Sequence, residues 1–332
     1  DIEFLIPLFR ANQTINFVLH WNYSYPGTYN PFVFIDYTHA LAEFNETNNI
    51  ISFGNLLIGG TLPVPSIQQV ILNSTFGTNL TGENLTAYIT GAQNTKTNIT
   101  DWLVNGMSIA VLNMPFDLIV SNGTIQDYST FENNGTLYGT SWSSLGRVGG
   151  AYRFDGIDDY ISVNETSSLD ITQAITLEAW VKHIGPFQQG FPGFETIISK
   201  GDSSYRLQLC SDQSAACPEV NPVNSFMFAI TGNGCGPIDL ASNVIPENNT
   251  WYHVVGTYDR SIMRIYVNGI ERNNRSCTGP ISANNYPLSI GENLEQPNRF
   301  WSGMIDEIKV YNRALSKQQI HENYVHGLDG RN

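Results

Sequence analysis

The stretch Ala151–Val163, AYRFDGIDDYISV, constrains the fold most because it sets an acidic turn between two strand-like runs. Gly156 can adopt a positive φ at little cost, so we expect a tight reversal across Asp155–Asp159. Shortly after it, ITLEAWVK (Ile175–Lys182) alternates with a period of two, which indicates a strand in a sheet. One face would carry Ile175, Leu177, Ala179 and Val181, and the other Thr176, Glu178, Trp180 and Lys182.

Further strand-like and turn-like segments follow one another along about two thirds of the chain. They are MPFD (Met114–Asp117), DYSTFENNGTLYG (Asp127–Gly139), FDGIDDYISV (Phe154–Val163), ITLEAWVK, IISKGDSSYRLQL (Ile197–Leu209), WYHVVGTYD (Trp251–Asp259), RIYVNG (Arg264–Gly269) and GMIDEIKVYNRALS (Gly303–Ser316). In this order they resemble the LamG-like, or concanavalin A-like, jelly-roll family, over residues about 112–326. The resemblance implies a jelly roll but little about function, since this fold supports many unrelated functions.

The predicted fold class is all-β, with two β-sandwich domains in series. Residues 1–112 read as an N-terminal β-sandwich, because short alternating runs are separated by glycine and proline breakers; this part resembles no family. Residues 113–332 form the predicted jelly roll. Within it, Asn268-Gly269 predicts a type I′ hairpin turn. Ser316 and Gln319 form a capping-box pattern, which predicts a short C-terminal helix to about Tyr324.

The segment Asp1–Phe9, DIEFLIPLF, is strongly apolar. It is either the first strand of its own sandwich or a donor strand that completes the sheet of a neighbouring subunit. Pro7 favours an edge position, because it lacks an N–H for a ladder hydrogen bond. Strand exchange of this kind would join copies of the chain head to tail into a filament.

Composition limits the partners. The formal net charge is −14 and we see no basic stripe, so nucleic acid is not an expected partner. No run of about 20 apolar residues predicts a membrane span. Because the chain begins at Asp1, we expect either a removed leader or a longer parent protein.

Asn-X-Ser/Thr acceptor patterns are dense and indicate an extracellular, N-glycosylated surface protein. The acceptors are Asn12, Asn22, Asn45, Asn73, Asn79, Asn84, Asn98, Asn122, Asn134, Asn164, Asn248 and Asn274. Four cysteines, Cys210, Cys217, Cys235 and Cys277, fit disulfides in an oxidising compartment. Four cysteines allow three pairings, and the sequence does not choose among them.

The resemblance also implies a structural Ca²⁺, because family members often hold one where the first and last strands meet. Asp127 and Asp306 would be its ligands, with Asp117 as a third. The alternative is that these aspartates accept backbone N–H bonds in turns.

No enzyme is predicted. Glycosidases need two carboxylates that flank the scissile bond, and hydrolases of this fold place alternating acids on one strand. Here Glu178 stands alone on its strand, and the Asp306 and Glu307 side chains would point to opposite faces.

For sugar binding, Trp142 and Trp301 are candidate platforms, with Phe187, Phe191 and Phe194 in an aromatic insertion. The main hypothesis is a filament subunit assembled through Asp1–Phe9; the alternative is a carbohydrate-binding adhesin or lectin-like accessory module.

Overall fold

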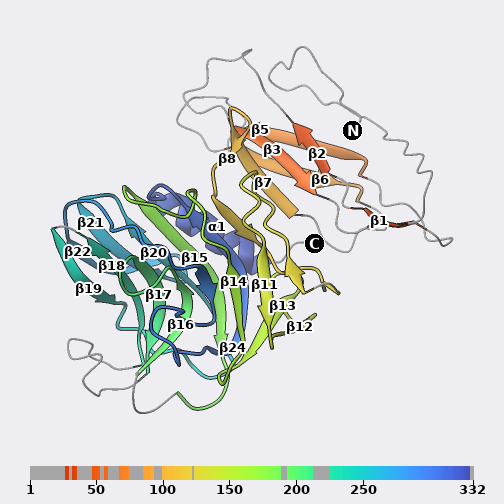
Figure 1. Ribbon diagram of the computed structural model, residues 1–332. Helices are drawn as coiled ribbons and strands as arrows, with labels where there is room; N and C mark the ends of the chain where they lie inside the picture. The colour runs from red at the N-terminus through yellow and green to blue at the C-terminus, as the bar shows by residue number, and fades with distance from the viewer. Residues whose placement is uncertain are drawn as a thin grey trace. The chain divides into compact units, whose positions relative to one another are not determined.

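The computed structural model of the protein describes residues 27–29, 32–35, 47–52, 56–58, 67–74, 85–92, 99–121, 123–187, 193–211, 224–232 and 234–329 (Figure 1). The chain divides into two compact units, Asp1–Ile109 and Ala110–Asn332. The predicted donor segment, Asp1–Phe9, lies outside the described residues.

The first unit contributes short antiparallel strands. They are β1 (Gly27–Tyr29), β2 (Phe32–Ile35), β3 (Thr47–Ser52), β4 (Leu56–Ile58), β5 (Gln69–Ser74), β6 (Leu85–Thr90), β7 (Ile99–Val104) and β8 (Met107–Ser108). They pair as β1-β4, β2-β3-β7-β8 and β5-β6. Along β7 buried and half-buried residues alternate, as expected for a strand with one face in a core.

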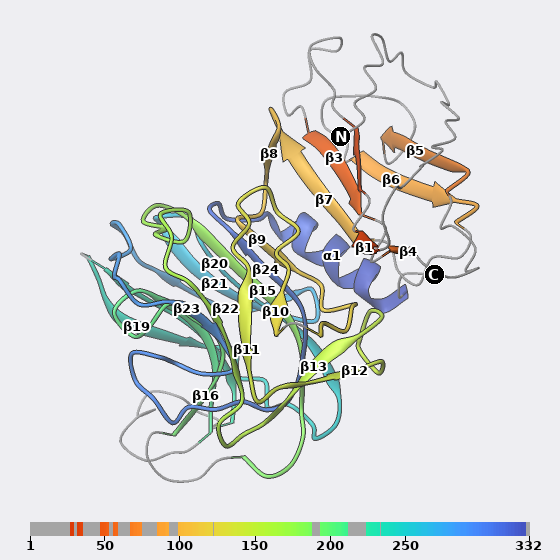
Figure 2. The ribbon, with the colours of Figure 1, turned by 45° about the vertical axis from the view of Figure 1, so that its right-hand side comes forward.

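The second unit is a sandwich of two antiparallel sheets (Figures 1 and 2). Its strands are β9 (Leu112–Met114), β10 (Thr124–Ile125), β11 (Gly135–Tyr138), β12 (Ser141–Ser143), β13 (Ala151–Asp155), β14 (Tyr160–Val163), β15 (Ile175–His183), β16 (Phe194–Ser199), β17 (Tyr205–Cys210), β18 (Phe226–Gly232), β19 (Cys235–Ala241), β20 (Trp251–Tyr258), β21 (Ile262–Val267), β22 (Ile270–Ser276), β23 (Leu288–Ile290) and β24 (Ser302–Tyr311). The β16 sheet has the order β10-β11-β14-β23-β16-β17-β18-β19. The β15 sheet has the order β12-β13-β24-β15-β20-β21-β22, with β9 also paired to β24.

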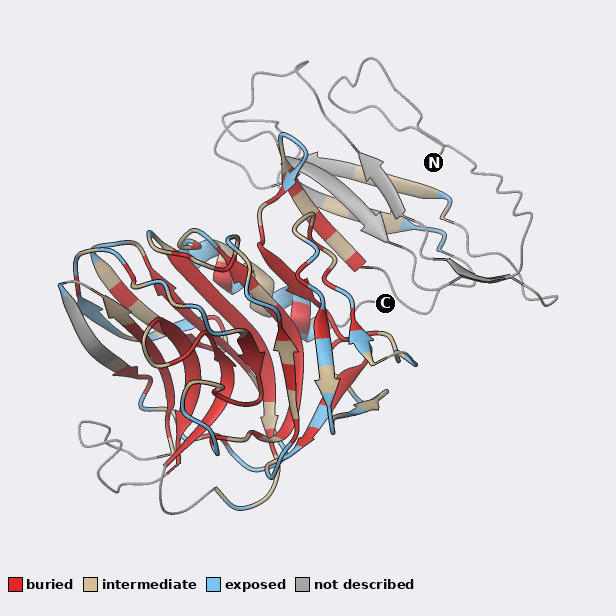
Figure 3. Ribbon diagram, in the orientation of Figure 1, coloured by how far each residue is buried: buried red, intermediate tan, exposed pale blue. Residues whose placement is uncertain are grey.

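The core lies between these sheets, where the ribbon in Figure 3 is mostly buried. Leu177 and Val181 of β15 face it as the alternation predicts, and Leu207 and Leu209 of β17 contribute from the other sheet. The opposite face of β15 is also buried, because the helix α1 (Lys317–Asp329) covers it. The all-β jelly roll with one C-terminal helix is therefore confirmed.

Local signals also form as expected. Asn268 (φ 54°) and Gly269 (φ 71°) both take the left-handed conformation that a type I′ turn requires between β21 and β22. At the start of α1, the N–H of Gln319 donates to Ser316 Oγ at 3.2 Å, and the N–H of Ser316 donates to Gln319 Oε1 at 3.0 Å. This reciprocal pair is the predicted capping box, although the helix continues past Tyr324 to Asp329.

A buried carboxylate, Glu292, lies in the segment between β23 and β24. Glu292 is 2% exposed, and the backbone N–H groups of Asn293, Asn298 and Arg299 interact with its carboxylate. Burial raises the pKa of Glu292 to about 7, against smaller lowering effects of nearby backbone N–H groups. Because the unfolded chain has a pKa of about 4.3, Glu292 favours the folded state at low pH. That contribution is lost as the pH rises from about 4.3 to 7.

We therefore expect Glu292→Gln to stabilise the protein at pH 8.5 by about 2–3 kcal/mol, and to have little effect at pH 4, below the pKa of the unfolded chain. Urea denaturation at the two pH values measures this difference. Glu165→Gln, at an exposed glutamate, is the matched control. An equal effect of Glu292→Gln at both pH values would contradict the prediction.

Candidate functional site

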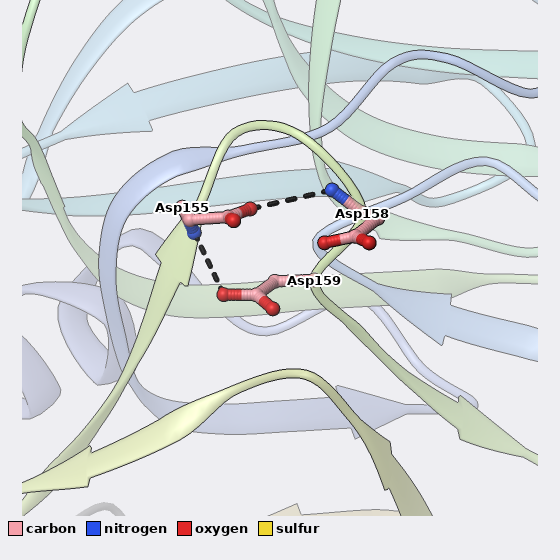
Figure 4. A group of neighbouring side chains, drawn as sticks. All are labelled: Asp155, Asp158 and Asp159. Carbon is pink, nitrogen blue, oxygen red and sulfur yellow. Dashed lines mark hydrogen bonds between the residues drawn. The ribbon is translucent and has the colours of Figure 1, made fainter.

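The acidic turn between β13 and β14 forms as the sequence predicts (Figure 4). Asp155 Oδ1 accepts the backbone N–H groups of Ile157 at 2.8 Å and Asp158 at 3.3 Å, and Asp159 Oδ2 accepts the N–H of Asp155 at 2.8 Å. One carboxylate oxygen from each aspartate lies within 4.8 Å of the others. Burial, together with the two neighbouring carboxylates, raises the pKa of Asp159. These hydrogen bonds explain Asp155 and Asp159 as parts of the turn, so we assign no ligand to it.

The three predicted Ca²⁺ ligands do not form such a group among the described residues. Asp127 is surrounded by donors: the N–H groups of Asn113 (2.8 Å), Ser129 (2.9 Å) and Asn133 (2.8 Å). The Ser129 hydroxyl adds a hydrogen bond at 2.6 Å. Asp127 thus ties its own loop to β9. Burial raises its pKa despite these bonds.

Asp306 and Asp117 hold the loop between β12 and β13. Asp306 Oδ2 accepts the N–H groups of Arg147 at 2.8 Å and Val148 at 2.9 Å, and Asp117 Oδ1 accepts that of Gly150 at 3.3 Å. Burial, with the nearby carboxylates of Glu307 and Asp117, raises the pKa of Asp306 well above its usual value. All three aspartates therefore accept backbone N–H bonds, and a Ca²⁺ bound to them stays a prediction.

The structure corrects the choice of Trp301 as a sugar platform. Trp301 is 0% exposed, and its ring packs edge-on against His183 at 5.5 Å between centroids. Trp142 is half-buried, packs against the core, and donates from Nε1 to the carbonyl of Phe116 at 2.9 Å. Trp301 therefore cannot present a ring face to a ligand.

The aromatic insertion is only partly described. The Phe187 ring lies 4.5 Å from that of His183, and Phe194 is buried with the guanidinium of Arg299 above its ring at 4.7 Å. Phe191 lies outside the described residues. The two described rings thus both have packing partners within the chain.

Four of the predicted glycosylation acceptors have described side chains, and all four are exposed: Asn134, Asn164, Asn248 and Asn274. The side chains of the other eight lie outside the described part of the chain, and glycosylation itself stays a prediction. Cys210 and Cys277 are both disulfide-bonded. Their partners lie among the side chains that the structure does not describe, so the pairing remains open.

An aromatic cavity that the sequence did not predict lies between the outer face of the β15 sheet and α1. Its volume is about 340 Å³, at the lower end of the range for small-molecule sites. We call it the Trp251 pocket. Its lining residues are Arg147, Trp180, Asn249, Thr250, Trp251, Asn268, Tyr324 and Leu328.

Stacked rings form one side of the Trp251 pocket. The ring centroids of Trp180 and His253 lie 5.2 Å apart, and the ring of Tyr324 lies 5.7 Å from Trp180 and 6.0 Å from His253. α1 approaches closely because Gly327 has no side chain: a Cβ there would lie 2.5 Å from Trp180 Nε1. The glycine thus lets the helix seat Tyr324 on the sheet.

A buried hydrogen bond between Glu178 and His253 anchors this wall. Glu178 Oε1 lies 2.8 Å from His253 Nε2, and Asn323 Nδ2 of α1 donates to Glu178 Oε2 at 3.0 Å. Burial opposes ionisation of Glu178, but the His253 and Asn323 hydrogen bonds and the charges of His253 and Lys309 outweigh it. The pKa of Glu178 is therefore held below its usual value. The carboxylate is ionised at neutral pH and joins α1 to two strands.

Cationic groups flank the rings. The Arg147 guanidinium lies over Trp180 at 4.9 Å from the ring centroid, and the Lys182 ammonium lies over Trp251 at 5.1 Å. Arg147 Nη2 also donates to the carbonyl of Leu328 at 3.1 Å, near the carboxyl end of α1. Flat rings, amide groups and a guanidinium are suited to bind a polar ring such as a sugar.

Sequence analysis missed this pocket because its residues come from distant segments. One local signal was available: Trp180 falls on the face of ITLEAWVK opposite the core residues, between Glu178 and Lys182. A tryptophan on that face is shielded from solvent only if another element packs against the outer side of the sheet. The pattern alone does not say that α1 is that element.

A family model described as the concanavalin A-like lectin/glucanases superfamily matches residues 154–321, about half of the chain. Among solved structures, the binding domain of Paraclostridial Mosquitocidal Protein 1 is 17% identical over 65% of this chain and 51% of its own, with a TM-score of 0.51. The botulinum neurotoxin serotype D ligand binding domain in complex with N-acetylneuraminic acid is 14% identical over 65% and 50%, with a TM-score of 0.50.

Domain 4 of AbnA, an extracellular arabinanase from Geobacillus stearothermophilus solved with arabinotriose, is 17% identical over 65% of this chain and 98% of its own, with a TM-score of 0.46. The chain spans about half the length of the mosquitocidal protein domain and of the botulinum neurotoxin domain. At these identities the likeness is one of fold. No curated protein sequence matches the chain. The family match and the two-sheet sandwich together place this chain in the concanavalin A-like lectin/glucanase superfamily.

Proposed function

We propose that this chain is an extracellular glycan-binding protein whose site is the Trp251 pocket. The observation that carries the proposal is the composition of this cavity. The rings of Trp251 and Tyr324 are half-buried, and the amides of Asn249 and Asn268 stand beside them. Sugar C–H faces pack on aromatic rings, while hydroxyl groups need such amide donors and acceptors. The similarly folded botulinum neurotoxin serotype D ligand binding domain was solved in complex with N-acetylneuraminic acid, which is consistent with this proposal.

The proposed role is binding without catalysis. Of the residues that line the Trp251 pocket, none is acidic. Glu178, which lies beneath the ring wall of the pocket, is 3% exposed and engaged by His253 and Asn323. Glycoside hydrolysis requires two carboxylates about 5–10 Å apart that face the substrate, so these residues do not supply it.

An extracellular location is supported by the disulfide-bonded Cys210 and Cys277 and by the four exposed acceptor asparagines. No helix in the described part of the chain is long and apolar enough to cross a membrane. The filament hypothesis rests on Asp1–Phe9, which the structure does not describe, and stays a prediction. Deleting that segment and imaging the native material by negative stain would test it.

Replacing Trp251 with alanine should weaken glycan binding at least about tenfold, the equivalent of 1.4 kcal/mol, because the main stacking surface is lost. Binding to a glycan array, followed by titration calorimetry on the best ligand, measures the change. Tyr286→Ala, which removes an exposed ring that does not line the pocket, is the matched control. Saturable glycan binding that survives Trp251→Ala would contradict the assignment of the pocket.

A further inference from the structure

We infer that the sugar bound by the Trp251 pocket carries a carboxylate. This inference rests on the proposed function and adds the chemical class of the ligand. It begins with charge: the chain has 30 acidic and 16 Lys and Arg residues, yet the one formally charged residue that lines the pocket is Arg147. A second cation, Lys182, lies over the ring of Trp251, which also lines the pocket.

Neither cation is neutralised within the described part of the chain. Arg147 and Lys182 form no ion pair there, whereas Arg206, Arg264 and Arg299 each contact an aspartate. Burial lowers the pKa of Lys182, so its charge is partly desolvated without a counter-ion. An anionic ligand would offset that cost.

The neighbouring carboxylates do not compete for these cations. Glu178 is ionised but already bound to His253 and Asn323. Asp306 is fully buried, and its Oδ2 accepts the backbone N–H groups of Arg147 and Val148. Neither of these two carboxylates therefore neutralises Arg147 or Lys182.

The geometry of Arg147 favours a carboxylate. Asp306 fixes its backbone, Trp180 supports its guanidinium plane, and Nη2 donates to the carbonyl of Leu328. Nε is buried without a hydrogen-bond partner. A guanidinium offers five N–H donors in a planar fork, which matches the two oxygens of a carboxylate. Trp251 and Tyr324 would then pack on the sugar ring that bears it.

The experiment uses the full chain and titrates it with paired probes. The methyl glycosides of N-acetylneuraminic acid and glucuronic acid are compared with their carboxamides, and glucose 6-sulfate serves as a second anionic probe. We expect at least one carboxylate glycoside to bind at least about tenfold more tightly than its carboxamide and than the sulfate. Its affinity should fall as the salt concentration rises.

Variants locate the effect. Arg147→Gln should weaken binding of the carboxylate glycoside at least about tenfold, and Lys182→Gln about threefold to tenfold; each variant should reduce the preference for the carboxylate over the carboxamide glycoside. Because Arg147 also binds α1, Lys182→Gln is the variant whose fold is not in question. Arg272→Gln, at an exposed arginine on β22, is the matched control and should change nothing.

Each outcome decides between the two claims. A neutral sugar that binds as tightly as the carboxylate glycoside, and is lost on Trp251→Ala, would overturn the inference and leave the proposed function standing. Preference for the sulfate would overturn the carboxylate assignment. If no sugar binds, the proposed function fails first and the inference fails with it.

Discussion

Trp301→Ala is expected to lower the free energy of unfolding by about 3–5 kcal/mol. The indole is fully buried among the core side chains between the two sheets, and it packs edge-on against His183. Truncation removes this apolar surface from the core and leaves a cavity that the rigid sheets cannot close. The loss should appear as lower stability, while glycan affinity measured well below the melting temperature stays close to that of the wild type.

Urea denaturation followed by circular dichroism measures this change. Trp301→Phe provides an internal control, because it keeps a ring in the core and removes an Nε1 that has no hydrogen-bond partner. It should cost much less than alanine. If Trp301→Ala kept wild-type stability but abolished glycan binding, the buried position of this residue would be wrong.

Trp301 also shows where inference from sequence stops. The pattern of a chain states which residues share a face of a strand, but burial depends on what packs against that face. Trp301 stands just before β24, and its backbone N–H donates to the carbonyl of Gly291 at 2.9 Å. Its ring packs against His183 of β15, so residues outside its own segment determine its surroundings. No local pattern contains that information. From sequence alone, an aromatic residue near a loop can be either an exposed ligand-binding ring or a buried core side chain.

Features set by neighbouring residues were predictable. The strand at Ile175–Lys182, the acidic turn at Gly156 and the capping box at Ser316 form as expected, since each depends on backbone preferences within a few residues. The Trp251 pocket was not predictable in this way. Its wall joins Arg147, Trp180, Trp251 and Tyr324, which lie on a loop, two strands and a helix.

The second prediction concerns the buried contact between Glu178 and His253 beneath this pocket, where we expect a large loss of stability on substitution. His253→Ala leaves the ionised Glu178 buried with Asn323 as its one remaining partner, and Glu178→Ala leaves His253 Nε2 buried without a partner. Removing one member of a buried pair commonly costs about 3–5 kcal/mol. Because the pKa of Glu178 is lowered in the folded state, its contribution is present above the unfolded pKa of about 4.3 and is lost as the pH falls through the folded value.

A double-mutant cycle tests whether the pair stabilises the fold through charge. The double variant Glu178→Met with His253→Phe replaces both partners by apolar groups of similar volume, and such exchanges are often neutral or stabilising. We therefore expect it to unfold within about 1–2 kcal/mol of the wild type, although the single variants Glu178→Met and His253→Phe are each far less stable. Additive losses in the cycle would contradict a coupled pair.

The same cycle connects the pair to binding. Asn323 ties α1 to Glu178, and the next residue, Tyr324, lines the Trp251 pocket. Either single variant should therefore weaken glycan binding as well as stability, because the helix is no longer held against the sheet. The double variant should recover stability without recovering full affinity, since a methionine side chain in place of Glu178 cannot accept the Asn323 hydrogen bond that positions α1. Full recovery of both would mean that apolar packing alone seats the helix.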